Sequence, residues 1–206
     1  MNNDTNTANV PARPTAPAPV GLDRPKLTFY HPNGKGSGSA VEMELHPAHD
    51  RTSGSIMLRM ANQMTVGDRR GPNPTFPRFD WENAISVKLD FTDLCKILQV
   101  FRGECEVIDE GRGLYHRSPR ASTRIVLRHL IEPTPGYSFE LYRTQSVGDE
   151  ENRARILFNP AEALGLCESI AGALYLVSFG IPMLIPHDTS VYLAETKEMR
   201  RAVAAA

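Results

Sequence analysis

From residue 26 onward, apolar and polar residues alternate in short segments, which is the period of a half-buried β-strand. The stretch ISVKLDF, residues 85–91, shows the pattern most clearly, because every second side chain is apolar. The alternation predicts strands at 26–31, 39–46, 54–64 and 84–91, with a loop at 67–78 between the third and the fourth.

The period then changes to that of a helix. An apolar stripe at helical spacing covers 94–101 and ends at Gly103. Thr92 and Asp93 precede the stripe, and we expect them to cap the helix. The first half of the chain is thus predicted to contain four strands and then a helix.

The second half of the chain repeats this order. Tyr30-His31 recurs as Tyr115-His116, and Val41 recurs as Val126 at the same spacing. The segment 54–63 aligns with 136–145, since each begins with glycine and ends with glutamine. These matches predict that the same arrangement of strands occurs twice.

A second helix ends the repeat. After a strand at 153–158, Asn159-Pro160 is a typical helix start, and the helical pattern runs to about residue 179. Its stretch 163–177 is apolar nearly all round, so it must be buried on several faces. Because the protein's own sheets cover one face, the remainder predicts a subunit interface. The candidate interface residues are Leu166, Ile170, Leu174 and Val177.

The chain therefore divides into three parts. Residues 1–25 are rich in Asn, Thr, Ala and Pro, with almost nothing to bury, and are predicted to form a disordered tail. Residues 26–180 form one α+β domain of two ββββα repeats, 26–104 and 112–180, with two antiparallel four-stranded sheets and helices packed at an oligomer core. Residues 181–206 are predicted to form a partly helical extension.

Composition narrows the class of protein. A chain of 206 residues with 41% hydrophobic and 23% charged residues is ordinary for a globular domain. A net charge of -1 means that any nucleic-acid surface must come from local clustering. Three cysteines without Cys-x-x-Cys spacing predict reduced thiols in a cytoplasmic protein. We expect neither a membrane span nor secretion, since no long uninterrupted apolar run or signal pattern occurs.

Glycine, histidine and serine patterns do not predict catalysis. The stretch Gly-Lys-Gly-Ser-Gly at 34–38 is followed by a strand, and Phe29 stands where a nucleotide-binding loop needs glycine. It predicts a hairpin whose Lys35 either approaches a nucleic-acid phosphate or is only a loop tip. The segment His-Pro-Ala-His-Asp at 46–50 lacks a third spaced ligand and predicts a polar turn, not a metal site. No nucleophile-elbow or metalloprotease spacing is present.

Basic and aromatic residues cluster locally, on the hairpin and loop of the first repeat and on the strands of the second. Arginine attracts phosphate, and aromatic rings stack on unpaired bases with little sequence preference. The alternative is a solvated sheet face with ordinary salt bridges. Trp81 is expected to plug the edge of the core. The candidate nucleic-acid-binding residues are Tyr30, Lys35, Arg69, Arg70, Phe76, Arg78, Tyr115, Arg117, Arg120, Arg124, Arg128, Tyr142 and Arg143.

A tandem ββββα chain with such a hairpin before its second strand resembles the Whirly family of single-stranded DNA-binding proteins. Their repeat unit also occurs in the positive cofactor 4 coactivators. Whirly proteins carry Lys-Gly-Lys-Ala-Ala-Leu at this hairpin, and Lys35-Gly36 with Ala40-Val41 is similar, although a serine replaces the second lysine. The resemblance covers residues 26–180. It implies a homotetramer with central helices, single-stranded DNA over and between the sheets, no catalytic residues and no cofactor.

We therefore expect a single-stranded DNA-binding protein with little sequence preference, acting in DNA replication, recombination, repair or transcription. Two other functions remain open at this point. One is RNA binding or annealing on the same fold, and the other is an oligomeric structural role without nucleic acid.

Overall fold

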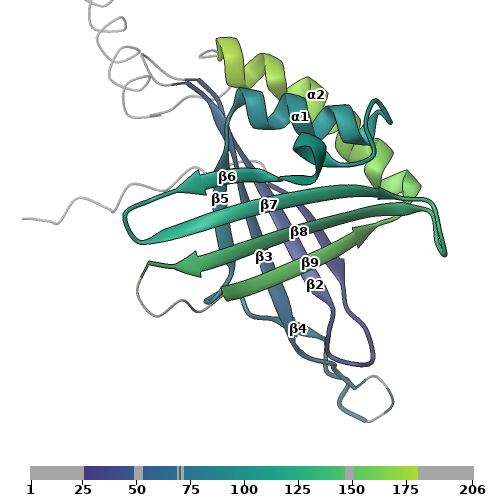
Figure 1. The fold of residues 1–206 in the computed structure, drawn as a ribbon. Coiled ribbons are helices and arrows are strands. Elements are labelled where there is room, and N and C mark those ends of the chain that lie inside the picture. The colour runs from purple at the N-terminus through teal and green to yellow at the C-terminus, as the bar shows by residue number, and fades with distance from the viewer. Residues whose placement is uncertain (1–25, 49–52, 69, 71, 147–150, 181–206) are drawn as a thin grey trace, which may run out of the picture.

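The first sheet contains the strands of the first repeat (Figure 1). Strands β1 (Lys26–His31), β2 (Ser39–His46) and β3 (Ser55–Thr65) pair antiparallel in sequence order. Two strands then share the next edge of β3: β4 (Arg78–Phe79) pairs with its end, and β5 (Ile85–Leu89) pairs with its first half. Sequence periodicity missed β4, because two residues are too few to show alternation.

The second sheet confirms the predicted four strands of the second repeat. It consists of β6 (Leu114–Arg117), β7 (Ala121–Leu130), β8 (Gly136–Gln145) and β9 (Glu151–Phe158), paired antiparallel in that order. A short 3₁₀ turn, η1 (Ile108–Gly111), precedes β6.

The computed structural model describes residues 26–48, 53–68, 70, 72–146 and 151–180. The predicted tail at 1–25, the predicted extension at 181–206 and the candidate residue Arg69 lie outside the described residues.

The two repeats share one fold, but their middle strands align one residue away from the sequence match. Tyr30 pairs with Ala40 and Tyr115 pairs with Arg124, so Val41 corresponds to Ile125 and not to Val126. A slip of one residue moves a side chain to the other face of a sheet. The expected equivalence of Val41 and Val126 is therefore wrong: Val41 belongs to the hydrophobic core, and Val126 alternates with the core residues of β7.

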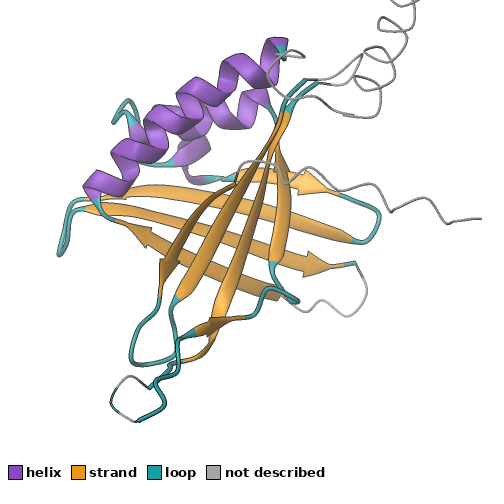
Figure 2. Ribbon diagram, turned by 180° about the vertical axis from the view of Figure 1, so that it is seen from behind, coloured by secondary structure: helices purple, strands orange, loops and turns teal. Residues whose placement is uncertain are grey.

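The sheets pack against each other through their inner faces and cross at a large angle (Figures 1 and 2). Phe158 takes part in this contact: its ring centroid lies 5.3 Å from that of Phe29 in the first sheet and 6.4 Å from that of Phe139 in the second. At the corner where β9 meets the first sheet, Ser39 and Asn62 side chains donate hydrogen bonds to the carbonyl oxygens of Arg155 and Arg153. Part of the unpaired edge of β9 is thus satisfied by side chains.

Both helices lie at one end of the crossed sheets and pack against each other (Figure 1). Helix α1 (Phe91–Phe101) begins with Asp90 as its N-cap, and Asp93 completes the capping box. The expectation that Thr92 and Asp93 cap this helix is therefore correct for Asp93, whose side chain accepts from the Asp90 backbone N–H, but the N-cap residue itself is Asp90 and not Thr92. Helix α2 (Pro160–Phe179) is capped by Asn159 in the same way, with Glu162 in the role of Asp93.

Helix α2 has one face in the core and one exposed apolar face. Leu166, Ile170 and Val177 are 0%, 2% and 2% exposed within the protomer, and Leu174 packs partly buried against the same cluster. These four predicted interface residues are thus core residues of the protomer. The large apolar side chains exposed on the other face of α2 are Leu164, Tyr175 and Phe179.

Among the described residues, α2 is the one helix long and apolar enough to cross a membrane by length and composition. The core helix of a globular domain meets the same criterion, and one face of α2, with Leu166, Ile170 and Val177, packs into the hydrophobic core.

Candidate nucleic-acid interface

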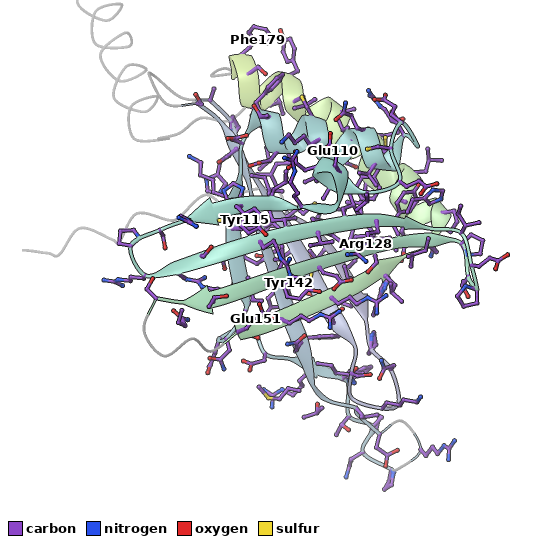
Figure 3. The ribbon with its side chains drawn as sticks, in the orientation of Figure 1. Glu110, Tyr115, Arg128, Tyr142, Glu151 and Phe179 are labelled. Atoms are coloured by element: carbon purple, nitrogen blue, oxygen red, sulfur yellow. The ribbon has the colours of Figure 1, made fainter. Side chains whose placement is uncertain are left out.

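A row of alternating tyrosine and arginine side chains crosses the outer face of the second sheet. Tyr115, Arg124, Tyr142 and Arg153 are successive cross-strand partners on β6, β7, β8 and β9. The guanidinium carbons of Arg124 and Arg153 lie 4.6 Å and 5.2 Å from the centroid of the Tyr142 ring. We call this row the Tyr–Arg ladder; Figure 3 labels Tyr115 and Tyr142 on the sheet.

A buried carboxylate, Glu140, holds one side of the ladder in place. It accepts hydrogen bonds from the Tyr142 hydroxyl, from Ser138 at 2.9 Å and from Arg153 at 2.6 Å. Burial of Glu140 opposes its ionisation, but these hydrogen bonds outweigh burial and lower the pKa of the carboxyl below its ordinary value. The ionised carboxylate therefore fixes the orientations of Tyr142 and Arg153 together.

The same face carries an excess of positive charge. Residues that alternate outward on these strands share one surface, because successive side chains of a strand point to opposite faces. Its arginines are Arg117, Arg124, Arg128, Arg153 and Arg155. Its acids are Glu140, which is already paired with Arg153 and Arg155, and Glu151 at the end of β9. A basic surface with exposed rings suits a phosphate backbone that carries unpaired bases.

The outer face of the first sheet carries an aromatic cluster instead of a ladder. The Tyr30 ring lies 5.5 Å from Phe79 and 6.5 Å from Trp81, and Arg59 lies over the Trp81 ring at 5.5 Å. The Arg59 guanidinium also donates to the Trp81 carbonyl at 3.0 Å. Trp81 was expected to plug the core edge, but it lies on the outer face, because β4 and the residues after it turn over that face.

The row of the first sheet that corresponds to the ladder is Tyr30, Ala40 and Ala61. Both alanines face outward, yet they are 0% and 1% exposed, so side chains of neighbouring elements cover them. Equivalent positions of the two repeats thus carry small buried residues under an aromatic cluster in one sheet and the half-buried Arg124 and Tyr142 in the other.

The structure gathers only some of the predicted residues. Tyr115, Arg117, Arg124, Arg128 and Tyr142 share the outer face of the second sheet. Arg120 lies in the exposed turn between β6 and β7.

Arg143 alternates to the inner face, opposite to Tyr142, and its Nε is buried with no hydrogen-bond partner among the described residues. Near the first sheet, Tyr30 joins the aromatic cluster, Arg78 starts β4, and Arg70 and Phe76 lie exposed in the preceding loop.

Sequence reasoning missed Arg153, Arg155 and Glu140. A signal for the two arginines was present, since ENRARILF at 151–158 places them at alternate positions, outward of a strand whose inner residues are apolar. Glu140 had no such signal, because its role depends on cross-strand neighbours that only the register brings together.

The glycine hairpin between β1 and β2 is fastened to its own chain. The Asn33 side chain accepts hydrogen bonds from the backbone N–H groups of Lys35 and Ser37, at 3.0 and 3.1 Å. Gly36 has φ of +71°, and a Cβ at Gly38 would clash with the His31 carbonyl oxygen and the Gln63 side chain. Lys35 is thereby held, exposed, at the tip of a defined turn.

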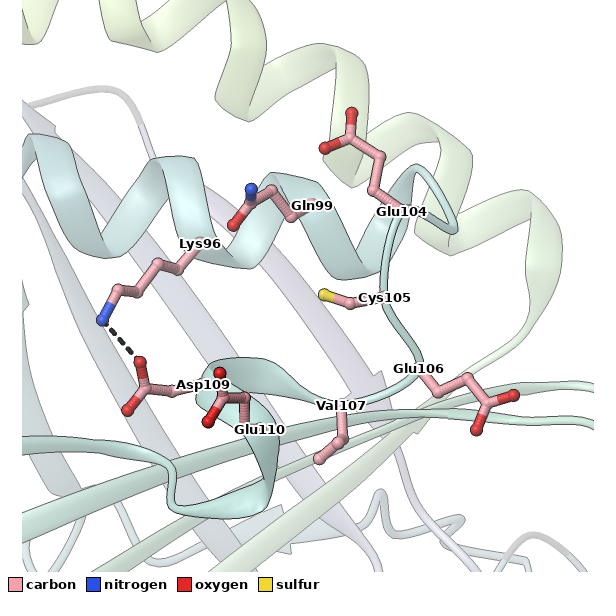
Figure 4. Close-up of a pocket in the computed structure, with 8 residues that line it drawn as sticks. All are labelled: Lys96, Gln99, Glu104, Cys105, Glu106, Val107, Asp109 and Glu110. Carbon is pink, nitrogen blue, oxygen red and sulfur yellow. Dashed lines mark hydrogen bonds and ion pairs between the residues drawn. The ribbon is translucent and has the colours of Figure 1, made fainter.

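A separate hollow of about 360 Å³ lies between α1 and η1 (Figure 4). Four acids, Glu104, Glu106, Asp109 and Glu110, line it with Lys96. The hydrogen bond from Lys96, 2.8 Å long, lowers the pKa of Asp109. Acidic walls repel phosphate, so this hollow is not part of the candidate interface.

The tandem ββββα arrangement with two crossed sheets and helices at one end is a Whirly-like fold. The chain is similar to the crystal structure of WHY1 from Arabidopsis thaliana, with 14% identity and a TM-score of 0.60 over 92% of this chain and 96% of that chain. It is also similar to WHY3 from the same plant, with 16% identity and a TM-score of 0.56 over 72% of this chain and 88% of that one. The plant transcriptional regulator PBF-2 aligns at 17% identity with a TM-score of 0.55, over 75% and 82% of the two chains. No protein-family model and no curated protein matches the sequence.

The Glu140 network predicts a pH dependence of stability. A carboxyl whose pKa is lowered by folding stabilises the folded state above its unfolded pKa, and this stabilisation is lost as pH falls through the folded pKa. Glu140→Gln should therefore lower the midpoint of thermal unfolding at pH 7 and reduce its dependence on pH below the ordinary value of 4.5. Circular dichroism melts between about pH 3 and pH 7 measure both effects.

The matched control is Glu151→Gln at the exposed start of β9, which should leave the melting profile close to that of the parent. A Glu140→Gln profile parallel to the parent at every pH would contradict the assignment of Glu140 as the anchor of the ladder.

Proposed function

We propose that this protein binds single-stranded DNA with little sequence preference, through the outer faces of its two sheets. The Tyr–Arg ladder is the observation that carries the proposal. Arginine neutralises phosphate, and the Tyr115 ring, 59% exposed, offers a face on which an unpaired base stacks. The Whirly-like fold supports the proposal, since the resemblance to that family implies single-stranded DNA over the sheets.

The chemistry of the ladder favours a single strand over a duplex. In a duplex the base faces are already stacked on one another, so tyrosine rings on a sheet have no free base faces to contact. Phosphate contacts from arginine carry no sequence information, which accounts for the proposed tolerance of sequence. The proposed role is binding rather than catalysis. It belongs to DNA replication, recombination, repair or transcription, and its proposed location is the cytoplasm.

A homotetramer is part of the same proposal. Leu164, Tyr175 and Phe179 are 64%, 60% and 74% exposed on the outer face of α2. The rings of Tyr175 and Phe179 lie 5.2 Å apart and form the end of this apolar surface. Exposed apolar surface of this kind marks an interaction site. Further copies of α2 are the proposed partners, which agrees with the central helices that the Whirly resemblance implies.

The binding proposal predicts a preference and a salt dependence. Fluorescence anisotropy should give higher affinity for a single-stranded DNA oligomer than for the duplex of the same sequence. Each lost phosphate contact on a single strand lowers the slope of log affinity against log salt by about 0.7. Replacing Arg124 and Arg153 together by alanine should therefore lower that slope by roughly 1.4.

Arg102→Ala is the matched control, because Arg102 is exposed at the end of α1, away from both outer faces. If the slope of log affinity against log salt is unchanged in the double variant, the Tyr–Arg ladder does not contact phosphate. Equal or tighter binding of the RNA counterpart would favour the RNA-binding function instead, and absence of binding to all three would favour a structural role.

The assembly proposal is tested by two sites on one helix. Leu164→Glu together with Tyr175→Glu places charge on the exposed face, and should reduce the particle mass in light scattering while the circular dichroism spectrum is kept. Leu166→Glu places charge in the protomer's own core and should unfold it, since a buried unpaired charge is strongly destabilising. A parent protein that is monomeric at micromolar concentration overturns the tetramer.

A further inference from the structure

Two histidines tie the repeats to each other in a reciprocal way. His31 on β1 donates from Nε2 to Glu162 of α2 at 2.8 Å. His116 on β6 approaches Asp93 of α1 through Nε2 at 3.1 Å. The histidine of the first repeat thus reaches the helix of the second, and the histidine of the second repeat reaches the helix of the first.

The acceptors are the same two carboxylates that close the capping boxes. Asp93 also accepts from the backbone N–H of Asp90, and Glu162 accepts from that of Asn159, each at 3.0 Å. Because a capping box fixes the side chain of its third residue at the helix N-terminus, both carboxylates are held in place before the histidine binds. Each histidine therefore meets a preorganised partner.

Each of these histidines directly follows a tyrosine of an outer face. Strand alternation sends Tyr30 and Tyr115 outward and His31 and His116 inward. Both strands lie at the edge of their sheet and pair on one side only, β1 with β2 and β6 with β7. A short edge strand such as β6, with four residues, is held weakly by backbone pairing alone.

We infer that His31 and His116 are positioning residues for nucleic-acid binding, which hold Tyr30 and Tyr115 at the outer faces by fastening their strands to the capping boxes of the opposite helices. This inference rests on the proposed function. It also links the two faces, since each stacking tyrosine is secured by the other repeat.

His116 provides the clearer test, because the His31 ring also packs edge-on against Phe158, 6.2 Å away in the core. His116→Leu removes the donor and keeps an apolar side chain, whereas His116→Gln keeps a donor. We expect His116→Leu to weaken binding of a single-stranded DNA oligomer about fivefold, the lower end of the contribution of one stacked base. His116→Gln should restore most of the affinity.

Three further measurements separate positioning from a general loss of stability. In a Tyr115→Ala background, His116→Leu should have almost no further effect on binding, because the histidine acts through that tyrosine. Amide hydrogen exchange across β6 should be faster in His116→Leu than in the parent, with or without DNA. His46→Leu is the control, since His46 is likewise paired with a carboxylate, Glu44 at 3.0 Å, but that carboxylate belongs to its own strand and to neither capping box.

The outcomes distinguish this inference from the function on which it rests. If the parent does not bind single-stranded DNA, the proposed function fails, and the exchange of β6 amides still decides whether His116 fastens the strand. If the parent binds and His116→Leu matches it in affinity and in exchange, the inference is overturned. A fivefold loss that persists in the Tyr115→Ala background overturns it as well.

Discussion

The period of two along each strand is the constraint on which the rest of this structure depends. Each sheet has one face against Phe158 and the shared core and one face outward. Of two adjacent residues on a strand, one therefore points into the core and the other points outward. This rule places Tyr115 outward beside His116 inward, and Tyr142 outward beside the inward Arg143. The candidate binding surface and the contacts that support it are therefore interleaved on the same strands, and the inward His31 and His116 reach carboxylates of the helix capping boxes.

The arginines on the outer face of the second sheet repel one another, and nearby groups offset part of this repulsion. Arg124 and Arg153 flank the Tyr142 ring, whose negative face attracts both cations. Glu140 offsets part of the charge of Arg153 and Arg155 from below, while Arg124, Arg117 and Arg128 are not engaged by it. The surface is consequently rigid at one end of the ladder and positively charged along its length. Rigidity lowers the entropy lost when a flexible strand of nucleic acid is bound.

Sequence periodicity predicted most of the fold, because a strand or helix with one buried face has apolar residues at regular intervals along the sequence. Strands β1, β2 and β8 agree with the predicted bounds, and both helices were placed. The site was harder to predict, since it depends on register between strands and not on order along one strand. The alignment of Val41 with Val126 is off by one residue. The two sequences do not reveal this error, but it assigns the side chain to the wrong face of the sheet.

The faces of α2 show a further limit of sequence reasoning. Its apolar residues are distributed all round the helix, so the pattern indicated that several faces are buried but did not show which side belongs to the protomer. Leu166 and Leu164 are equally apolar, and only the packing against the sheets separates the core residue from the exposed one.

The duplication leaves two outer faces with different chemistry, and this difference is itself informative. At the row where the second sheet has Tyr115, Arg124 and Tyr142, the first has Tyr30, Ala40 and Ala61. Small residues let β4 and the residues after it turn over the first sheet, where Phe79 and Trp81 join Tyr30. The first face is thus suited to stacking and the second to phosphate as well. In the proposed complex, a nucleic-acid strand that crosses both faces would meet rings on each, while most of its charge would be neutralised on the second. The two repeats would then contribute unequally to one binding surface.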